Sequence, residues 1–295
     1  MRKAVWLASI ACASFAADPA VEGPMIGYVN SAAGVRRVLG VTGSARLSAP
    51  LTGELHGALV LAGRGAAVAK NPAGALVRID FKDGSLLSLG VENVADFVVS
   101  PSGGAVAAST AGRLHLLSAS GEPKGDYVAP GAVRLMAVSD DAAAVVVSVG
   151  GAGGEAVHVV DAHGSRQVFQ ADRIAAVAFV PGGRDSVFAD GEGAIYRITG
   201  DLQFAQIGTA PGTVALAATA DGRVLAVARK TIVTLRSDAA PSTSADLVCE
   251  ATTAKPLGHS RFLLTSGEDG PMWMVDASAA DLRLAFIPEA VNEIE

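Results

Sequence analysis

The chain has 295 residues, which is enough for two ordinary domains or for one closed ring of repeats. Half of its residues are hydrophobic, only 5% are aromatic, and the formal net charge is -6. Because the acidic residues are scattered and the basic residues form no cluster, the composition argues against a nucleic-acid partner.

The first 17 residues have the pattern of a secretory signal peptide. Arg2 and Lys3 form a charged start, residues 4–13 are apolar, and Ser14-Phe15-Ala16 is a small-x-small cleavage site. We therefore expect an exported protein, periplasmic or extracellular, whose mature chain is a single domain over residues 18–295.

The two cysteines add little to this expectation. Acylation at Cys12, giving a lipoprotein, is an alternative to cleavage, although Ser9 stands where such sites normally have Leu. Removal of the signal leaves Cys249 as the only thiol, so no intramolecular disulfide can form, and packing is its expected role. Beyond the signal, polar residues interrupt every apolar run before the ~20 residues of a membrane helix, so we expect no transmembrane helix in the mature chain.

Two short strand patterns, at residues 25–30 and 35–39, are followed by a series of repeats. Turn-rich tetrads recur 39, 39, 41, 39 and 38 residues apart, beginning at Leu61, Ser100, Ser139, Val180, Thr219 and Leu257. A period near 40 residues indicates one supersecondary unit that is copied and packs against its neighbours. A unit of this length with four short strands is typical of a β-propeller blade.

The clearest copy predicts strands at residues 174–180, 186–189, 194–199 and about 203–207, separated by Gly-rich turns. Its third strand aligns with similar β-branched and apolar segments in the other copies, at residues 75–80, 114–118, 156–161, 231–236 and 271–276. No stretch after the signal keeps a helical period without an intervening Gly or Pro, so the fold class is all-β.

Six complete repeats cover about residues 55–290, and residues 25–40 form a partial blade. We interpret the latter as the third and fourth strands of a blade that lies between the last and first copies. There it would latch the ring by strand pairing, because no disulfide is available to close it. Seven blades are favoured, and a six-bladed ring with this hairpin added to a neighbouring blade stays open.

The repeats resemble the WD40-like and YVTN families of propellers. In the clearest copy, Val177-Ala-Phe-Val-Pro-Gly-Gly183, Asp190-Gly-Glu-Gly and Ile195-Tyr-Arg-Ile198 are similar to the pattern V-x-F-S-P-D-G…D-G-x-I-x-x-W-D. The Asp that ends the third strand remains in three copies, but Ile or Val replaces the Trp before it, and the Gly-His pair is missing. The resemblance implies a binding platform and names no substrate.

The mouth of the central channel is the place to expect a ligand, and four residues are candidates there: His56, Asp96, Arg134 and Lys255. Only His56 and Asp96 are potential metal ligands, fewer than a zinc or calcium site needs, so we expect no metal centre. Arg134 and Lys255 would attract an anionic peptide or ligand.

No cofactor motif is present, and no set of titratable groups assembles a catalytic site. The sequence therefore favours an exported, non-enzymatic propeller that binds a protein, peptide or glycan through its loops. An enzyme of the propeller lyase, lactonase or hydrolase kind is the alternative. A structural subunit of an envelope complex would differ from the favoured function only in the permanence of its contacts.

Overall fold

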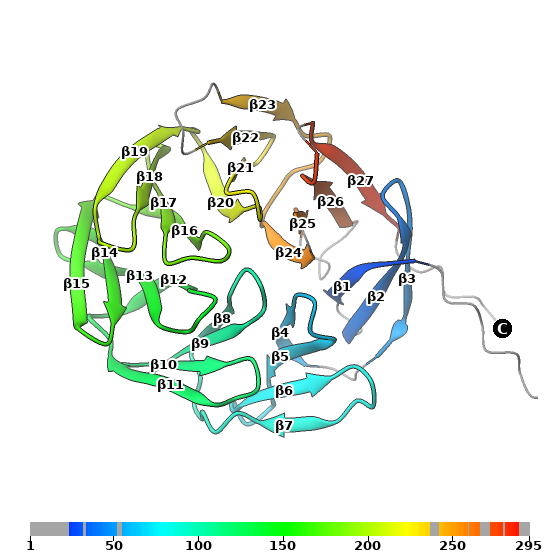
Figure 1. Cartoon of the computed structure of the whole chain (residues 1–295), viewed down its shortest axis with the longest axis horizontal. Helices are drawn as coiled ribbons and strands as arrows, with labels where there is room; N and C mark the ends of the chain where they lie inside the picture. Colours follow the sequence, from blue (N-terminus) through cyan, green and yellow to red (C-terminus); the bar gives the residue numbers. More distant parts are fainter. Residues whose placement is uncertain are drawn as a thin grey trace, which may run out of the picture.

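The computed structural model describes residues 24–31, 34–51, 55–236, 242–258, 260–265, 272–279 and 281–288. All the regular elements in these residues are β-strands, and they form seven antiparallel sheets. The sheets stand around a common axis as the blades of a seven-bladed β-propeller (Figure 1). The predicted signal peptide and Cys12 lie outside the described residues.

The strands of each blade follow one another in the chain, from the axis outwards. Blade 1 has three: β1 (Met25–Ser31), β2 (Gly34–Val41) and β3 (Ser44–Pro50). Blade 2 comprises β4 (His56–Leu61), β5 (Ala66–Lys70), β6 (Leu76–Asp80) and β7 (Leu86–Ser88). Blade 3 comprises β8 (Asp96–Val99), β9 (Ala105–Thr110), β10 (Arg113–Ser118) and β11 (Pro123–Val128).

The remaining blades repeat the four-stranded arrangement. Blade 4 comprises β12 (Val133–Val138), β13 (Ala144–Gly151), β14 (Gly154–Asp161) and β15 (Gly164–Ala171). Blade 5 comprises β16 (Ile174–Phe179), β17 (Ser186–Asp190), β18 (Ala194–Ile198) and β19 (Phe204–Thr209). Blade 6 comprises β20 (Thr213–Ala218), β21 (Val224–Ala228), β22 (Thr231–Leu235) and β23 (Thr243–Asp246). Blade 7 comprises β24 (Lys255–Gly258), β25 (Arg261–Leu263), β26 (Met272–Asp276) and β27 (Arg283–Ile287).

These blades confirm the all-β fold class and the six complete repeats, and within these six repeats each predicted third strand is the third strand of its blade. The recurrent aspartate at the end of this strand has a local role. Its carboxylate accepts a hydrogen bond from the backbone N–H two residues further on, at Asp80, Asp161 and Asp276. Such a side-chain turn reverses the chain into the outer strand.

The core of the ring consists of clusters between neighbouring blades. The second strands β5, β9, β13, β17 and β21 are buried along almost their whole length, and most of their residues are Ala or Val. Cys249, after β23, is also buried in such a cluster, and burial raises the pKa of its thiol. Small side chains on these strands let adjacent sheets approach one another near the axis.

The partial blade, blade 1, lies where the sequence predicts it, between the last and first complete repeats (blades 7 and 2), but the assignment of its strands was wrong. The hairpin of residues 25–40 supplies β1 and β2, and β1 is the strand of blade 1 closest to the axis, beside β4 and β24. The outer strand is β3, which the sequence did not predict. Alternating apolar residues indicate a strand, but they do not indicate its position within a blade.

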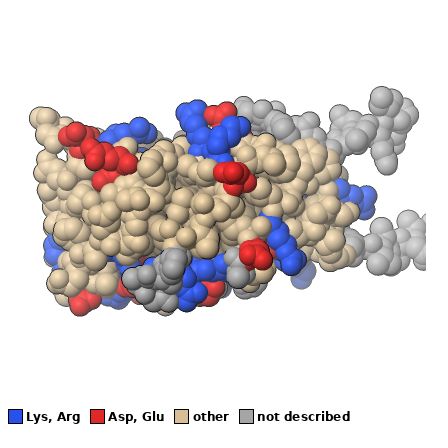
Figure 2. Space-filling model, turned by 90° about the horizontal axis from the view of Figure 1, so that it is seen from above, with Lys and Arg blue, Asp and Glu red and all other residues tan. Residues whose placement is uncertain are grey.

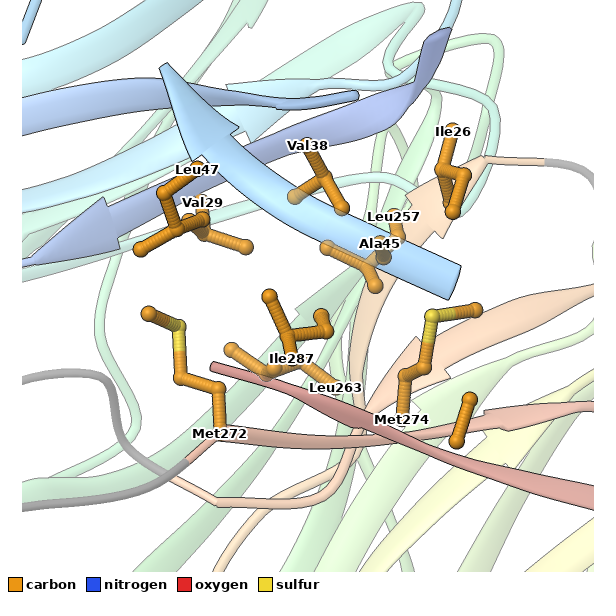
Figure 3. Close-up of a cluster of buried hydrophobic side chains, with 11 residues drawn as sticks. Ile26, Val29, Val38, Ala45, Leu47, Leu257, Leu263, Met272, Met274 and Ile287 are labelled. Carbon is orange, nitrogen blue, oxygen red and sulfur yellow. The ribbon is translucent and has the colours of Figure 1, made fainter. Parts of the chain in front are cut away.

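Apolar packing contributes to ring closure. Among the described residues, blades 1 and 7 are separate sheets, and apolar side chains fill the space between them (Figure 3). This closure cluster contains Ile26, Val29, Val38, Ala45, Leu47, Leu257, Leu263, Met272, Met274, Ala285 and Ile287. Because eleven buried side chains interdigitate across the junction, burial of apolar surface stabilises the closed ring.

Gly27 marks the tightest approach in this junction. A Cβ added there would lie 2.2 Å from the backbone oxygen of Leu257 in β24, a distance that no side chain adopts without movement of the backbone. The absence of a side chain on β1 is therefore what allows blade 1 to pack against blade 7.

We expect Gly27→Ala to lower the free energy of unfolding by about 1–3 kcal/mol, because overpacking forces neighbouring backbone apart. The matched control is Gly183→Ala, where the nearest atom to an added Cβ is 3.8 Å away, and we expect it to change stability by less than about 0.5 kcal/mol. Urea unfolding followed by fluorescence measures both. Equal changes in the two variants would contradict this account of closure.

Candidate functional site

One end of the central channel opens into a cavity of about 540 Å³. Six of its lining residues lie at or near the ends of the inner strands of blades 2 to 7: Val60, Val99, Val138, Phe179, Ala218 and Leu257. Blade 1 contributes residues 25–28, at the start of β1. The turns between first and second strands surround the opening, with Ser102 and Pro181 among them.

The walls of the cavity are mainly apolar, and Arg261 is the one charged residue among the described lining residues. Its Nε donates to Asp276 Oδ2 at 3.0 Å. The same carboxylate accepts hydrogen bonds from Thr42 Oγ1 in blade 1 and from the backbone and hydroxyl of Ser278. Asp276 thus both orients the arginine of the cavity and links blade 7 to blade 1.

The pKa of Asp276 reflects this network. Burial alone would raise it, but the hydrogen bonds from Ser278, Arg261 and Thr42 outweigh burial and lower the pKa from 3.8 to about 2. The carboxylate is therefore ionised at neutral pH. In this form it accepts a charge-assisted hydrogen bond that orients the guanidinium of Arg261.

A second carboxylate braces the opening across three blades. Asp140, in the turn after β12, accepts from the backbone N–H of Ser102 in blade 3 and of Gly182 in blade 5, both at 2.8 Å. Burial alone would raise the pKa of Asp140, but hydrogen bonds from Ser102 and Gly182 lower it below its ordinary value. These contacts hold three turns at the cavity opening in a fixed arrangement.

The four residues singled out from the sequence lie at the other ends of the inner strands. His56, Asp96 and Lys255 begin β4, β8 and β24, and Arg134 is the second residue of β12. Each belongs to a different blade, and the described side chains of Asp96, Arg134 and Lys255 do not line the 540 Å³ cavity. The side chain of His56 lies outside the description.

Asp96, Arg134 and Lys255 have separate surroundings and do not form a common site. Asp96 Oδ1 accepts from the backbone N–H of Phe97 at 2.8 Å. Arg134 forms an ion pair with Glu155, a buried carboxylate that also accepts from Ser148 Oγ and from the backbone N–H of Ile174. Lys255 is exposed and borders a small cavity of about 50 Å³. Glu155 thus joins blades 4 and 5, and Arg134 pairs with it from within blade 4.

Sequence reasoning missed the apolar cavity because the search at the channel mouth was for titratable groups. A signal was present in the inner strands, where small and branched apolar residues precede each turn, as in Val177-Ala178-Phe179. Arg261 directly follows the turn-rich tetrad that begins at Leu257, and its position at the opening depends on the pairing of β24 with β25.

Among the described residues, no group of three or more His, Cys, Asp or Glu side chains is placed to hold a metal ion. No helix long and apolar enough to cross a membrane occurs in that part of the chain either.

Comparisons with known proteins show the fold alone. No protein-family model matches the chain, and no curated protein matches it. PorZ, an essential bacterial surface component of the type-IX secretion system of Porphyromonas gingivalis, has a TM-score of 0.61 at 12% identity. The match covers 90% of this chain and 38% of that one, so this chain spans well under half of PorZ.

A functionally unknown protein from Desulfotomaculum acetoxidans has a TM-score of 0.59, also at 12% identity, with 89% of this chain and 99% of that one covered. At 12% sequence identity, these matches show a similarity of fold alone. The chain is thus a seven-bladed β-propeller with no matching sequence family.

The ionised Asp276 makes the ring sensitive to acid. A carboxylate with a pKa lowered from 3.8 to about 2 stabilises the fold above pH 4, and this contribution is lost as the pH falls towards 2. We expect Asp276→Asn to be less stable than the wild type at pH 7 by about 2 kcal/mol, and the difference to shrink below pH 4.

Denaturant unfolding of both proteins between pH 2 and 7 measures this difference. Asp201→Asn, at an exposed aspartate between β18 and β19, serves as the control and should unfold like the wild type throughout. A stability difference for Asp276→Asn that is independent of pH would contradict the proposed role of the charge.

Proposed function

We propose that this protein is an exported, non-enzymatic binding platform and that its ligand is an apolar peptide segment of another protein. The observation that carries the proposal is the 540 Å³ cavity, which has mainly apolar walls and opens at one end of the channel. Ligand sites are concave and largely apolar, with a few polar groups that set orientation, and Arg261 provides such a group here.

Two features favour binding over catalysis. Catalytic sites bring two or three titratable groups together in one pocket, whereas Arg261 is the one charged residue among the described residues of this cavity. The turns at the opening are braced by Asp140, so the cavity is preformed, which lowers the conformational cost of binding. No particular feature of the described site supports a lyase, lactonase or hydrolase.

The exported location rests on the sequence. Residues 1–17 are proposed to be a cleaved signal peptide and residues 18–295 the mature propeller, with acylation at Cys12 as the alternative processing. The resemblance of the repeats to WD40-like and YVTN propellers supports a platform function, and PorZ, of which 38% matches this fold, is a bacterial surface component.

Much of the outer edge of the propeller carries no charged side chains (Figure 2). Seen from its edge, the molecule carries Lys, Arg, Asp and Glu mainly along its two flat borders, with both signs mixed (Figure 2). The visible edge has no large patch of positive or of negative charge (Figure 2). We therefore assign recognition to the channel cavity and not to electrostatic attraction by this edge.

We expect an acetylated peptide with the sequence of β20, Thr-Val-Ala-Leu-Ala-Ala, to bind the mature protein, and Ala178→Trp to weaken binding at least tenfold, since the indole would occupy the cavity. Ala205→Trp on the exposed outer strand β19 is the matched control and should bind like the wild type.

Isothermal titration calorimetry with the three proteins measures these affinities. Asp96→Ala and Lys255→Ala, at the other end of the channel, should leave the affinity unchanged. Peptide binding that survives Ala178→Trp but is lost in either of these two variants would move the site to the residues first selected from the sequence.

A further inference from the structure

Charge is distributed unevenly along the wall of the 540 Å³ cavity. Arg261, the one charged residue among the described lining residues, begins β25 and follows the turn that bounds the opening. Further in, the described wall is formed by uncharged residues of the inner strands, such as Met136, Val177 and Leu216. A ligand in this cavity therefore meets a charged group at the opening and uncharged residues in the interior.

The inner limit of the cavity is uncharged as well. Five residues line both the 540 Å³ cavity and the adjoining 50 Å³ cavity, and so stand between the two: Tyr28, Val60, Val99, Pro256 and Leu257. An ionised group without a partner in such surroundings is costly, so the part of the ligand that reaches them must be neutral. Because both ends of a free chain are charged, this interior favours an internal segment over a chain terminus.

The guanidinium of Arg261 has donors available for a ligand. Its Nε is engaged by Asp276, which leaves the N–H groups of the two Nη atoms, and the side chain is 35% exposed. The Asp276 side chain is only 8% exposed and also accepts from Thr42 and Ser278, so it offers a ligand cation no comparable access. The opening therefore favours a carboxylate over an ammonium group.

The turn before Arg261 is held in a strained conformation. Ser260, in the cavity wall, has a φ of 54°, in the left-handed region that residues other than glycine rarely adopt. Its carbonyl oxygen accepts a hydrogen bond of 2.8 Å from the backbone N–H of Ala277. Such strain persists where the surrounding structure imposes it, and it is concentrated at ligand and active sites.

We propose that the ligand is an uncharged, apolar loop of a partner protein with an acidic residue beside it, and that this residue's carboxylate binds the Nη groups of Arg261. This inference rests on the proposed function and specifies the ligand of the same cavity. The apolar part enters the interior, where burial of its surface supplies affinity. The carboxylate stays at the opening, where charge-assisted hydrogen bonds fix the orientation of the loop.

Segments of this chain outside the description are the alternative occupants. Residues 289–295 are Glu-Ala-Val-Asn-Glu-Ile-Glu, in which no more than two successive residues lack a carboxylate or amide side chain. Their entry would take unpaired carboxylates into the apolar interior, which disfavours them relative to a neutral loop. Residues 18–23 have one apolar run, Pro-Ala-Val, which buries less apolar surface than a longer loop. A protein of residues 24–288 belongs in the experiment beside the full mature chain.

The first experiment uses peptides with the sequence of β20 that are extended by one Asp, Asn or Lys and blocked at both ends, so that the added side chain carries the only charge. In calorimetry on the mature chain, we expect the Asp peptide to bind about tenfold more tightly than the Asn peptide, and the Lys peptide to bind most weakly. A peptide with Asp in place of its central Leu should not bind, because its carboxylate would enter the interior.

Protein variants assign the preference to one arginine. Arg261→Gln should make the Asp and Asn peptides bind equally, and Arg261→Lys should restore part of the difference. Arg64→Gln is the matched control: Arg64 is exposed in the turn between β4 and β5 but does not line the cavity, so the tenfold preference should persist. Each comparison is made between two peptides on one protein, so a change in stability does not explain it.

The outcomes separate the inference from the proposed function. Equal affinity of the Asp and Asn peptides, or a preference that survives Arg261→Gln, would overturn the inference while apolar binding in the cavity still stands. Tighter binding of an unextended peptide with a free carboxyl end would overturn the assignment to an internal loop.

Failure of every peptide to bind both the mature chain and residues 24–288 would overturn the proposed function together with the inference. Binding by the shortened chain alone would show that the chain's own residues fill the cavity, and would overturn recognition of a partner. Binding by both proteins, with the Asp peptide preferred, supports the proposal.

Discussion

Crowding of seven sheets around one axis is the constraint on which the rest of the structure depends. Blades converge towards the centre, so their second strands are buried on both faces and must carry small side chains. This requirement explains a composition that is half hydrophobic but poor in aromatic residues. It also explains the cavity, because inner strands that end in small and branched apolar residues leave space at the axis.

Closure of the ring and formation of the cavity share the same residues. The junction of blades 7 and 1 combines an apolar cluster, the close approach at Gly27 and the carboxylate of Asp276. That carboxylate also orients Arg261 at the cavity opening. Loss of the junction would therefore remove the site, and the stability of the ring and the affinity for a ligand are physically coupled at this point.

The repeats could be predicted from the sequence because each blade contains the same local signals. The aspartate after the third strand makes its own turn, and Gly-rich turns bound the strands, so the six complete repeats and the order of their strands follow from spacing. Spacing alone left six or seven blades open, and the position of β1 at the axis could not be predicted, because an apolar pattern does not indicate the place of a strand within its blade. Arg261 and the cavity were missed because both depend on how distant blades meet, and the channel residues selected by charge lie at the opposite end.

Hydrogen exchange of the mature protein, with and without the acetylated β20-sequence peptide, tests the central claim most directly. Binding in the channel cavity predicts slower exchange of backbone amides in its wall, such as those of residues 25–28 and 177–179, with outer strands such as β19 unchanged. Binding without added protection in the wall of the cavity, or with protection confined to an outer strand, would contradict the account.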